Sequence, residues 1–378
     1  MNIIIASDSF KGTLSSKKVN AIIESSIIEK YPQFSITKVS IADGGEGTVE
    51  AITDSLSAHI KTTLVSDALC KKNIEAKWAI FNNGCDAIME VASVVGLNLL
   101  DKKSQNPCYT STYGIGELIL EILKHNVKNI YIGLGGSSTN DAGTAAVSAL
   151  GIKFLDSQYN PLPLGGVYLN ELAHIDISNL NPLIKSKKFI LLNDVQNILC
   201  GKEGASFIFA TQKGATAEEV ILLDNGLNKF QEILKKDLSI DVSTLKGGGA
   251  AGGIAAGFFA FLCAELKSGI ESLLELINFN SIISKADLII TGEGKIDDQT
   301  KYGKTITGIT SKAKNIPVIA FCAILDGNKE KIKKDLGLKN IFSVINENVS
   351  IDMSLENAEK YLRDTVTKNL KNITYIGL

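Results

Sequence analysis

The two ends of the chain share one pattern, in which short, wholly apolar segments alternate with segments of helical periodicity. The first apolar segment covers residues 2–6, and apolar side chains then recur at helical spacing over 19–27. Short apolar segments return at 287–290, 317–321 and 341–344. Strands look like this when helices cover both faces of a parallel sheet. We therefore predict an α/β fold in which both chain ends build one doubly wound unit.

The middle of the chain departs from this alternation. Segments 60–65, 74–81 and 87–91 look like successive strands joined by polar turns, which is typical of hairpins. We expect a large inserted α/β domain here, so that 1–62 plus 281–378 form one domain and 63–280 form the other. The remaining predicted elements are strands at 36–42, 129–132 and 189–192, and helices at 46–57, 114–124, 139–150, 217–236, 250–264, 305–314 and 355–370.

Composition excludes several classes of protein. The formal net charge is −2, so there is no basic excess for a nucleic acid. The longest apolar stretch, 250–264, is about 15 residues, whereas a membrane span needs about 20. The six cysteines form no CxxC pair and there are only three histidines, which argues against a zinc site. With no secretion signal at the N-terminus, we expect a cytoplasmic protein that contacts neither nucleic acid nor membrane.

Polar and glycine-rich clusters follow most of the predicted strands, where open α/β sheets place their ligands. Asp8 and Lys11 follow the first strand, and they could hold a metal and a phosphate or cap the next helix. Asp194 follows a later strand and could bind Mg²⁺ or accept a proton, or form only a turn. Residues 291–299, running on to Gly303-Lys304-Thr305, bring acids, lysines and glycines to one strand end, which favours function.

Three further clusters are rich in glycine. Residues 43–48 open a predicted helix, where free backbone N–H groups bind anions. Acidic capping is the alternative, but it does not require three glycines and two acids. Residues 133–143 join a strand to a helix and suit a phosphate or a carboxylate. Residues 247–253 are either a second phosphate cradle or a crowded helix entry.

Familiar nucleotide and hydrolase motifs are incomplete. Gly303-Lys304-Thr305 ends like a P-loop, but Asp298 stands where the loop needs its first glycine. Ser138 likewise replaces the third glycine of a dinucleotide fingerprint that would begin at Gly133. No histidine accompanies a serine-elbow motif, and no protein-kinase signature occurs.

Taken in order, the clusters resemble the serial motifs of the type I glycerate kinase family. The resemblance lies in Asp8-Ser9-Phe10-Lys11-Gly12, Ala42-Asp43-Gly44-Gly45-Glu46-Gly47-Thr48, Gly135-Gly136-Ser137-Ser138-Thr139-Asn140-Asp141, Gln212-Lys213-Gly214-Ala215 and Gly292-Glu293-Gly294-Lys295-Ile296-Asp297. It spans nearly the whole chain. The sequence departs from the family at Ser7, where proline is usual, and at Gln196 and Ile198, while the acid at 194 is kept.

The resemblance implies phosphorylation of D-glycerate by ATP with Mg²⁺, with 2-phosphoglycerate the more usual product in bacterial relatives. It also implies a Rossmann-like domain made from both chain ends, an inserted α/β domain, and an active site in the cleft between them. Phosphoryl transfer requires mainly positioning and charge neutralisation. We therefore expect Lys11 or Lys295 to neutralise phosphate or carboxylate oxygens, and Asp194 or Asp297 to accept the hydroxyl proton.

The other expected site residues bind the metal or the substrates. Asp43 and Glu293 are the predicted Mg²⁺ ligands. The predicted substrate- and phosphate-binding residues are Asp8, Ser9, Gly44, Gly45, Gly135, Gly136, Ser137, Ser138, Thr139, Asn140, Asp141, Gly292 and Gly294.

Other functions stay open at this point. The run from Gly133 to Ser138 is also similar to the phosphate loop of sugar and mevalonate-type kinases, although those loops usually carry an upstream proline and no Asn-Asp pair. A kinase for another small hydroxy acid or sugar acid, or a non-catalytic metabolite sensor, would share much of this pattern. The sequence leaves the choice between a monomer and a homodimer open.

Overall fold

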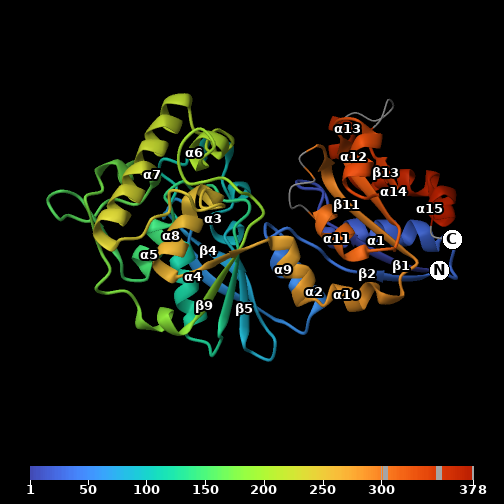
Figure 1. Cartoon of the computed structure of the whole chain (residues 1–378), viewed down its shortest axis with the longest axis horizontal. Coiled ribbons are helices and arrows are strands. Elements are labelled where there is room, and N and C mark those ends of the chain that lie inside the picture. The colour runs from blue at the N-terminus through green and yellow to red at the C-terminus, as the bar shows by residue number, and fades with distance from the viewer. Residues whose placement is uncertain (299, 301–304, 346–350, 377–378) are drawn as a thin grey trace. The chain divides into compact units, whose positions relative to one another are not determined.

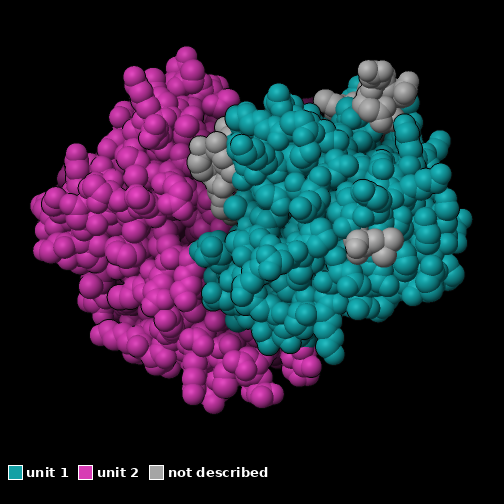
Figure 2. All heavy atoms as spheres, turned by 45° about the vertical axis from the view of Figure 1, so that its right-hand side comes forward, with its two compact units in different colours: residues 1–43, 50–56, 268–378 teal, residues 44–49, 57–267 magenta. Residues whose placement is uncertain are grey.

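The computed structural model describes residues 1–298, 300, 305–345 and 351–376. The chain forms two compact units, which are coloured separately in Figure 2. The terminal unit comprises residues 1–43, 50–56 and 268–378, and the central unit comprises 44–49 and 57–267. Both chain ends lie in the terminal unit (Figure 1).

The observed boundaries differ from the expected ones near residues 62 and 280. Strand β3 (His59–Ser66) pairs along its whole length with β4 (Asn73–Phe81), which places residues 59–62 in the central unit. Helix α9 (Gly269–Leu276) contacts α11 (Thr305–Ala313) and belongs to the terminal unit. Residue pairing, which the sequence does not display, therefore sets both boundaries.

The terminal unit contains a five-stranded parallel sheet in the order β13-β12-β11-β1-β2. In the order of the chain, these strands are arranged 2-1-3-4-5. The direction of progression reverses between β1 and β11, so the switch point of the sheet lies there. The bounds are β1 Asn2–Ser7, β2 Ser35–Lys38, β11 Leu288–Ile296, β12 Val318–Leu325 and β13 Asn340–Ser343. Strand β2 is shorter than the predicted 36–42.

Both faces of this sheet are covered. Ile3 and Ile5 pack on one face with α1 (Ser16–Ile28) and α14 (Ala358–Lys368), whereas Ile4 points to the opposite face and is also buried. Helix α11 contacts β11 and β12. The wholly apolar β1 is explained by this double burial. The other helices of this unit are α2 Thr48–Ser55, which begins in the central unit, α10 Phe279–Ile282, α12 Lys329–Asp335, α13 Ile351–Glu356 and α15 Leu370–Ile376.

The central unit contains a mixed six-stranded sheet in the order β10-β9-β6-β5-β4-β3. Strands β3, β4 and β5 form an antiparallel meander, which confirms the predicted hairpins. Strands β5, β6, β9 and β10 are parallel, so their carboxyl ends meet at one edge. The bounds are β5 Asp86–Glu90, β6 Asn129–Gly133, β9 Lys188–Leu192 and β10 Glu265–Lys267, with a separate small hairpin of β7 Lys153–Leu155 and β8 His174–Asp176.

Helices pack this sheet into a single large core that includes Trp78 and Phe230. The longest helix, α7 (Ala217–Leu238), begins with a capping box in which Thr216 and Glu219 satisfy each other's backbone N–H groups. The predicted helix over 250–264 starts only at Ile254, because Ala251 and Gly252 have φ of 54° and 69°. The other helices are α3 Ala92–Val95, α4 Tyr113–Leu123, α5 Thr144–Ala149, α6 Ala205–Phe209 and α8 Ile254–Leu262.

Among the described residues, no helix combines the length and the apolar character that a membrane span requires.

Candidate active site

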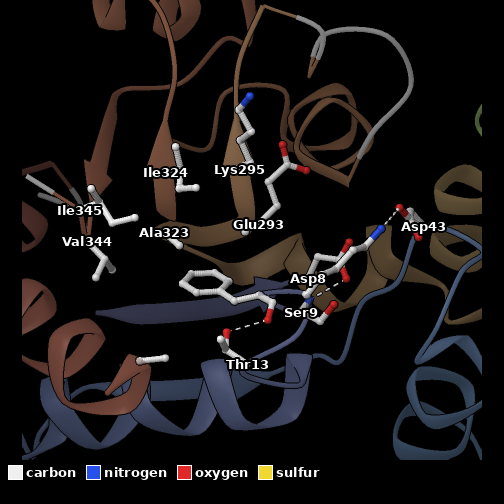
Figure 3. A pocket seen from close by; sticks show the side chains of 14 residues that line it. Asp8, Ser9, Thr13, Asp43, Glu293, Lys295, Ala323, Ile324, Val344 and Ile345 are labelled. Atoms are coloured by element: carbon white, nitrogen blue, oxygen red, sulfur yellow. Dashed lines mark hydrogen bonds and ion pairs between the residues drawn. The ribbon is translucent and has the colours of Figure 1, made fainter. Parts of the chain in front are cut away.

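A pocket of about 320 Å³ lies at the carboxyl ends of the terminal unit's strands (Figure 3). Its two sides differ in chemistry. Figure 3 shows Asp8, Ser9 and Asp43 on one side, the aliphatic side chains of Ala323, Ile324, Val344 and Ile345 on the other, and Glu293 and Lys295 from β11 above them. The pocket therefore lies over the switch point between β1 and β11, the place where open α/β sheets bind ligands.

Asp8 follows β1 and is almost fully buried. Its backbone N–H donates to the Gly292 carbonyl at 2.8 Å, and its carboxylate accepts from the Ser9 N–H at 2.6 Å and the Thr305 hydroxyl at 3.1 Å. Burial raises the pKa of Asp8 to about 7, and the nearby charge of Asp43 adds to the rise. Asp8 therefore holds its proton more strongly than an exposed carboxyl group does.

Lys11 and Asp43 form an ion pair beside Asp8. The Lys11 Nζ lies 3.2 Å from Asp43 Oδ2. The negative charge of Asp43 raises the pKa of Lys11, and Asp8 and Glu293 contribute in the same direction. The ammonium group therefore stays charged. Three carboxyl groups and this lysine are brought together from segments that lie almost 300 residues apart in the chain.

Lys295 and Asp297 face elsewhere. The Lys295 Nζ lies 2.8 Å from Asp326 and 3.5 Å from Asp297, and Figure 3 shows it directed away from Asp8. The Asp297 backbone N–H donates to Thr300 Oγ1 at 3.0 Å. Lys295 lines the pocket, whereas Asp297 is not among the described lining residues. Gln299, Gly303 and Lys304 of the same predicted cluster lie outside the described residues.

Two glycine clusters of the central unit lie back to back. The Gly135 N–H donates to the Gly44 carbonyl at 3.3 Å. A Cβ on Gly135 would lie 2.6 Å from the Gly45 Cα, closer than any side chain allows. The end of β6 therefore meets Gly44 and Gly45 through close backbone contact, which explains why Gly133 and Gly135 are needed.

Glu90, which the sequence reasoning missed, takes up the anion-binding donors of this segment. Its carboxylate accepts from the Val49 N–H at 2.6 Å and the Gly47 N–H at 3.3 Å. Burial raises the pKa of Glu90 to about 7. These two donors at the start of α2 were expected to face a substrate anion, and in the structure they face the protein's own carboxyl group. The signal available in the sequence was Glu90 itself, a single acidic residue in the otherwise apolar predicted strand 87–91.

The glycine-rich loop at 133–143 is held by the buried Lys213, which belongs to one of the family motifs but was not predicted as a site residue. Its Nζ donates to Ser137 Oγ at 3.0 Å and to the Thr139 carbonyl at 2.8 Å. Burial lowers the pKa of Lys213 to about 7, and the negative charge of Asp141 opposes this. Ser138 donates to the Val95 carbonyl at 2.8 Å. The serines of this loop are therefore engaged inside the protein.

Asp141 shapes the end of the same loop. It accepts from the Thr112 N–H at 3.0 Å, from Thr112 Oγ1 at 2.8 Å and from the Gly143 N–H at 3.1 Å. Helix α5 starts only at Thr144, not at residue 139 as predicted, because these bonds hold 139–143 outside the helix. Residues 133–143 therefore join β6 to α5 as expected, but the predicted helix start at residue 139 is wrong.

Two polar atoms of this loop are buried without a hydrogen bond. Asn140 Nδ2 donates to Ser206 Oγ at 3.0 Å, but Asn140 Oδ1 and Thr139 Oγ1 have no hydrogen-bond partner among the described residues. Buried polar groups are normally satisfied, so these two atoms are the best substrate-facing candidates in the loop.

The remaining two clusters have different roles. A Cβ on Gly252 would lie 2.0 Å from the Thr139 carbonyl oxygen, so the glycines at 247–253 allow close packing against the 133–143 loop. This favours the crowded helix entry over a second phosphate cradle. Asn193, after β9, closes a local turn by accepting from the Val195 N–H at 3.1 Å. Its neighbour Asp194 is partly exposed at that strand end.

Comparison with known proteins identifies the family. The model of the glycerate kinase family matches residues 3–374. The chain belongs to the glycerate kinase family. This confirms the resemblance inferred from the motifs and makes the protein an enzyme of that family.

Relatives within the glycerate kinase family match along their full length. The chain is 40% identical to the glycerate 2-kinase of Escherichia coli strain K12 over 375 residues, covering 99% of this chain and 97% of that protein. It is 38% identical to a glycerate kinase of Halalkalibacterium halodurans, with 95% of each covered. A crystal structure of a putative glycerate kinase 2 from Salmonella typhimurium LT2 superposes with a TM-score of 0.82 at 38% identity, covering 99% of this chain and 98% of that one.

A kinase of this family uses ATP as its phosphate donor, and Mg²⁺ is the metal expected with it. Among the described residues, no group of three or more acidic, histidine or cysteine side chains is arranged to hold a metal by itself. Mg²⁺ usually takes only one or two protein carboxylates and completes its shell with phosphate oxygens and water. Asp43 and Glu293, which both line the pocket, fit that requirement.

Proposed function

We propose that the protein transfers the γ-phosphoryl group of ATP to a hydroxyl of D-glycerate, with 2-phosphoglycerate the favoured product. Family membership and the names of the relatives support the reaction. The observation that carries the proposal is the pocket over the β1–β11 switch point, where Lys11 lies among the carboxyl groups of Asp8, Asp43 and Glu293.

The charges of this pocket suit a triphosphate with its metal. Mg²⁺ bound by Asp43 and Glu293 would offset the charge of the phosphates and of the carboxylates together. Lys11, held by Asp43 at 3.2 Å, would place its ammonium beside a phosphate oxygen. A phosphoryl group needs this fixed positive charge because its transition state spreads charge over three oxygens.

The acceptor of the hydroxyl proton is assigned to Asp194 or Asp297. Asp297 lies 3.5 Å from the Lys295 amine, and Asp194 follows β9 in the central unit. Replacing each by asparagine removes the proton acceptor but keeps the shape. Glycerate-dependent ATP consumption should fall at least about hundredfold in the variant that lacks the base. Near-normal kcat in both variants would remove this assignment.

Product analysis tests the reaction itself. Purified protein, ATP and D-glycerate are incubated with and without Mg²⁺, and phosphorus NMR identifies the phosphorylated hydroxyl. A panel of other hydroxy acids and sugar acids examines the alternative kinases. A metabolite sensor would bind glycerate without turnover.

An active site in a cleft between the two domains, a cytoplasmic location and a monomeric or dimeric state remain predictions.

A further inference from the structure

The pocket of the terminal unit has an apolar side that glycerate does not explain. Ala323 and Ile324 end β12, and Val344 and Ile345 follow β13. D-Glycerate carries two hydroxyls and a carboxylate on three carbons, so it has no apolar face to place against aliphatic side chains. A purine base has two such faces. The apolar side of the pocket therefore fits a different reactant, one that has an apolar surface.

The aliphatic wall is fixed in position by backbone hydrogen bonds. The Val344 N–H donates to the Cys322 carbonyl at 2.8 Å, and the Ile345 N–H donates to the Ala323 carbonyl at 3.0 Å. The Ser343 hydroxyl lies 3.2 Å from the Ala323 carbonyl and 2.9 Å from the Ile345 carbonyl. The wall is thus formed before a ligand arrives, which lowers the cost of binding a flat ring.

The spacing of the strands matches the length of a nucleotide. The apolar side lies over β12 and β13, and the carboxylate side lies over β1 and β11. Neighbouring strands are about 4.8 Å apart, so β13 and β1 are separated by three steps, or roughly 14 Å. An extended nucleotide triphosphate can therefore have its base at one side and its terminal phosphates at the other.

We propose that the apolar side of this pocket binds the base and ribose of ATP, while the carboxylate side and Lys11 receive the triphosphate with its Mg²⁺. The inference rests on the proposed function, and it assigns the terminal unit to the nucleotide. Glycerate then depends on residues outside the aliphatic wall. Ala323 is the residue that decides the fit, because a larger side chain there fills the space of the ring.

The test compares two pocket variants with a matched control. Ala323→Phe fills the base position, and Ile324→Ala removes part of the wall without adding bulk. Ala217→Phe, at an exposed position where α7 begins, makes the same alanine-to-phenylalanine change far from the wall in sequence. Calorimetric titration with ADP and Mg²⁺ gives Kd without turnover, and initial rates give the KM of ATP and of glycerate. Circular dichroism verifies that each variant is folded.

The expected result is a rise of at least about tenfold in the Kd of ADP and the KM of ATP for Ala323→Phe, and a smaller rise for Ile324→Ala. The KM of glycerate at saturating ATP should stay within about twofold of the wild-type value, because glycerate does not bind against the aliphatic wall. Ala217→Phe should match the wild type. If Ala323→Phe does not fold, Ile324→Ala still decides the question.

Two outcomes would separate this inference from the proposed function. Wild-type turnover of glycerate with an unchanged Kd of ADP in both pocket variants would overturn the nucleotide assignment alone. So would a raised KM for glycerate with nucleotide affinity intact. Conversely, ADP binding that is weakened in both variants, in a protein that never phosphorylates glycerate, would support this site and reject the reaction.

Discussion

Replacing Glu90 by glutamine should change how the stability of the central unit depends on pH. The pKa of Glu90 is raised by burial from 4.5 to about 7 in the folded protein. The folded state therefore keeps a proton that the unfolded state has released between these two values. Stability from this group is fullest below pH 4.5, falls as the pH rises towards 7, and is level above that. A shift of this size corresponds to about 3 kcal/mol, since one pKa unit is about 1.4 kcal/mol.

Trp78 offers a direct assay for this effect. It is the only tryptophan in the chain, is buried in β4, and neighbours the strand that ends with Glu90. Urea unfolding followed by its fluorescence at pH 5 and pH 8 reports the unit that holds Glu90. The wild type should lose about 2.5 kcal/mol more than Glu90→Gln between these two values, since part of the effect is already lost at pH 5. Glu75→Gln, at an exposed position on β4, is the matched control and should follow the wild type. Equal pH dependence in wild type and Glu90→Gln would refute the reasoning.

Substitutions at three further positions test the site. Lys213→Met removes the hydrogen bonds to Ser137 and the Thr139 carbonyl. Steady-state kinetics should show kcat lowered at least about tenfold. Lys213→Arg should not restore kcat, because a guanidinium group has a different shape from the buried ammonium. Lys11→Met should raise the KM of ATP about tenfold or more, since a phosphate loses its charged partner; an unchanged KM would contradict this. Asp141→Asn should destabilise the protein by about 1–3 kcal/mol in urea unfolding, because an amide nitrogen would meet donors at Thr112.

The strands were the most predictable part of the fold. Apolar runs such as 2–6 and alternating ones such as 74–81 fall on β1 and β4, because burial on two faces or on one face leaves a direct trace in the sequence. The helix predicted over 139–150 exists as α5, but its start was placed five residues too early, since small residues carry little periodicity and the side chain of Asp141 bonds with Thr112, 29 positions away. Such a tertiary bond has no local signal.

The candidate site was predictable to a similar extent. Asp8, Asp43 and Glu293 line one pocket because Asp8 and Asp43 come after β1 and β2, and Glu293 lies near the carboxyl end of β11, in one parallel sheet whose strand ends can be read from the sequence. Lys295 was expected to join them, but its amine pairs with Asp326, a partner supplied by the next strand. Buried Lys213 could not be found from spacing alone, because its partners lie more than 70 residues earlier.

The pairing of β1 with β11 has a consequence for synthesis. Ile3 lies beside Leu288, so the first strand of the chain is made 285 residues before its neighbour. At 5 to 20 residues per second, that interval is roughly 15 to 60 s. During this time three consecutive isoleucines have only β2 to pair with, whereas every strand of the central unit has already been made. Release of the chain before residue 288 would leave an apolar strand edge open to association with other chains.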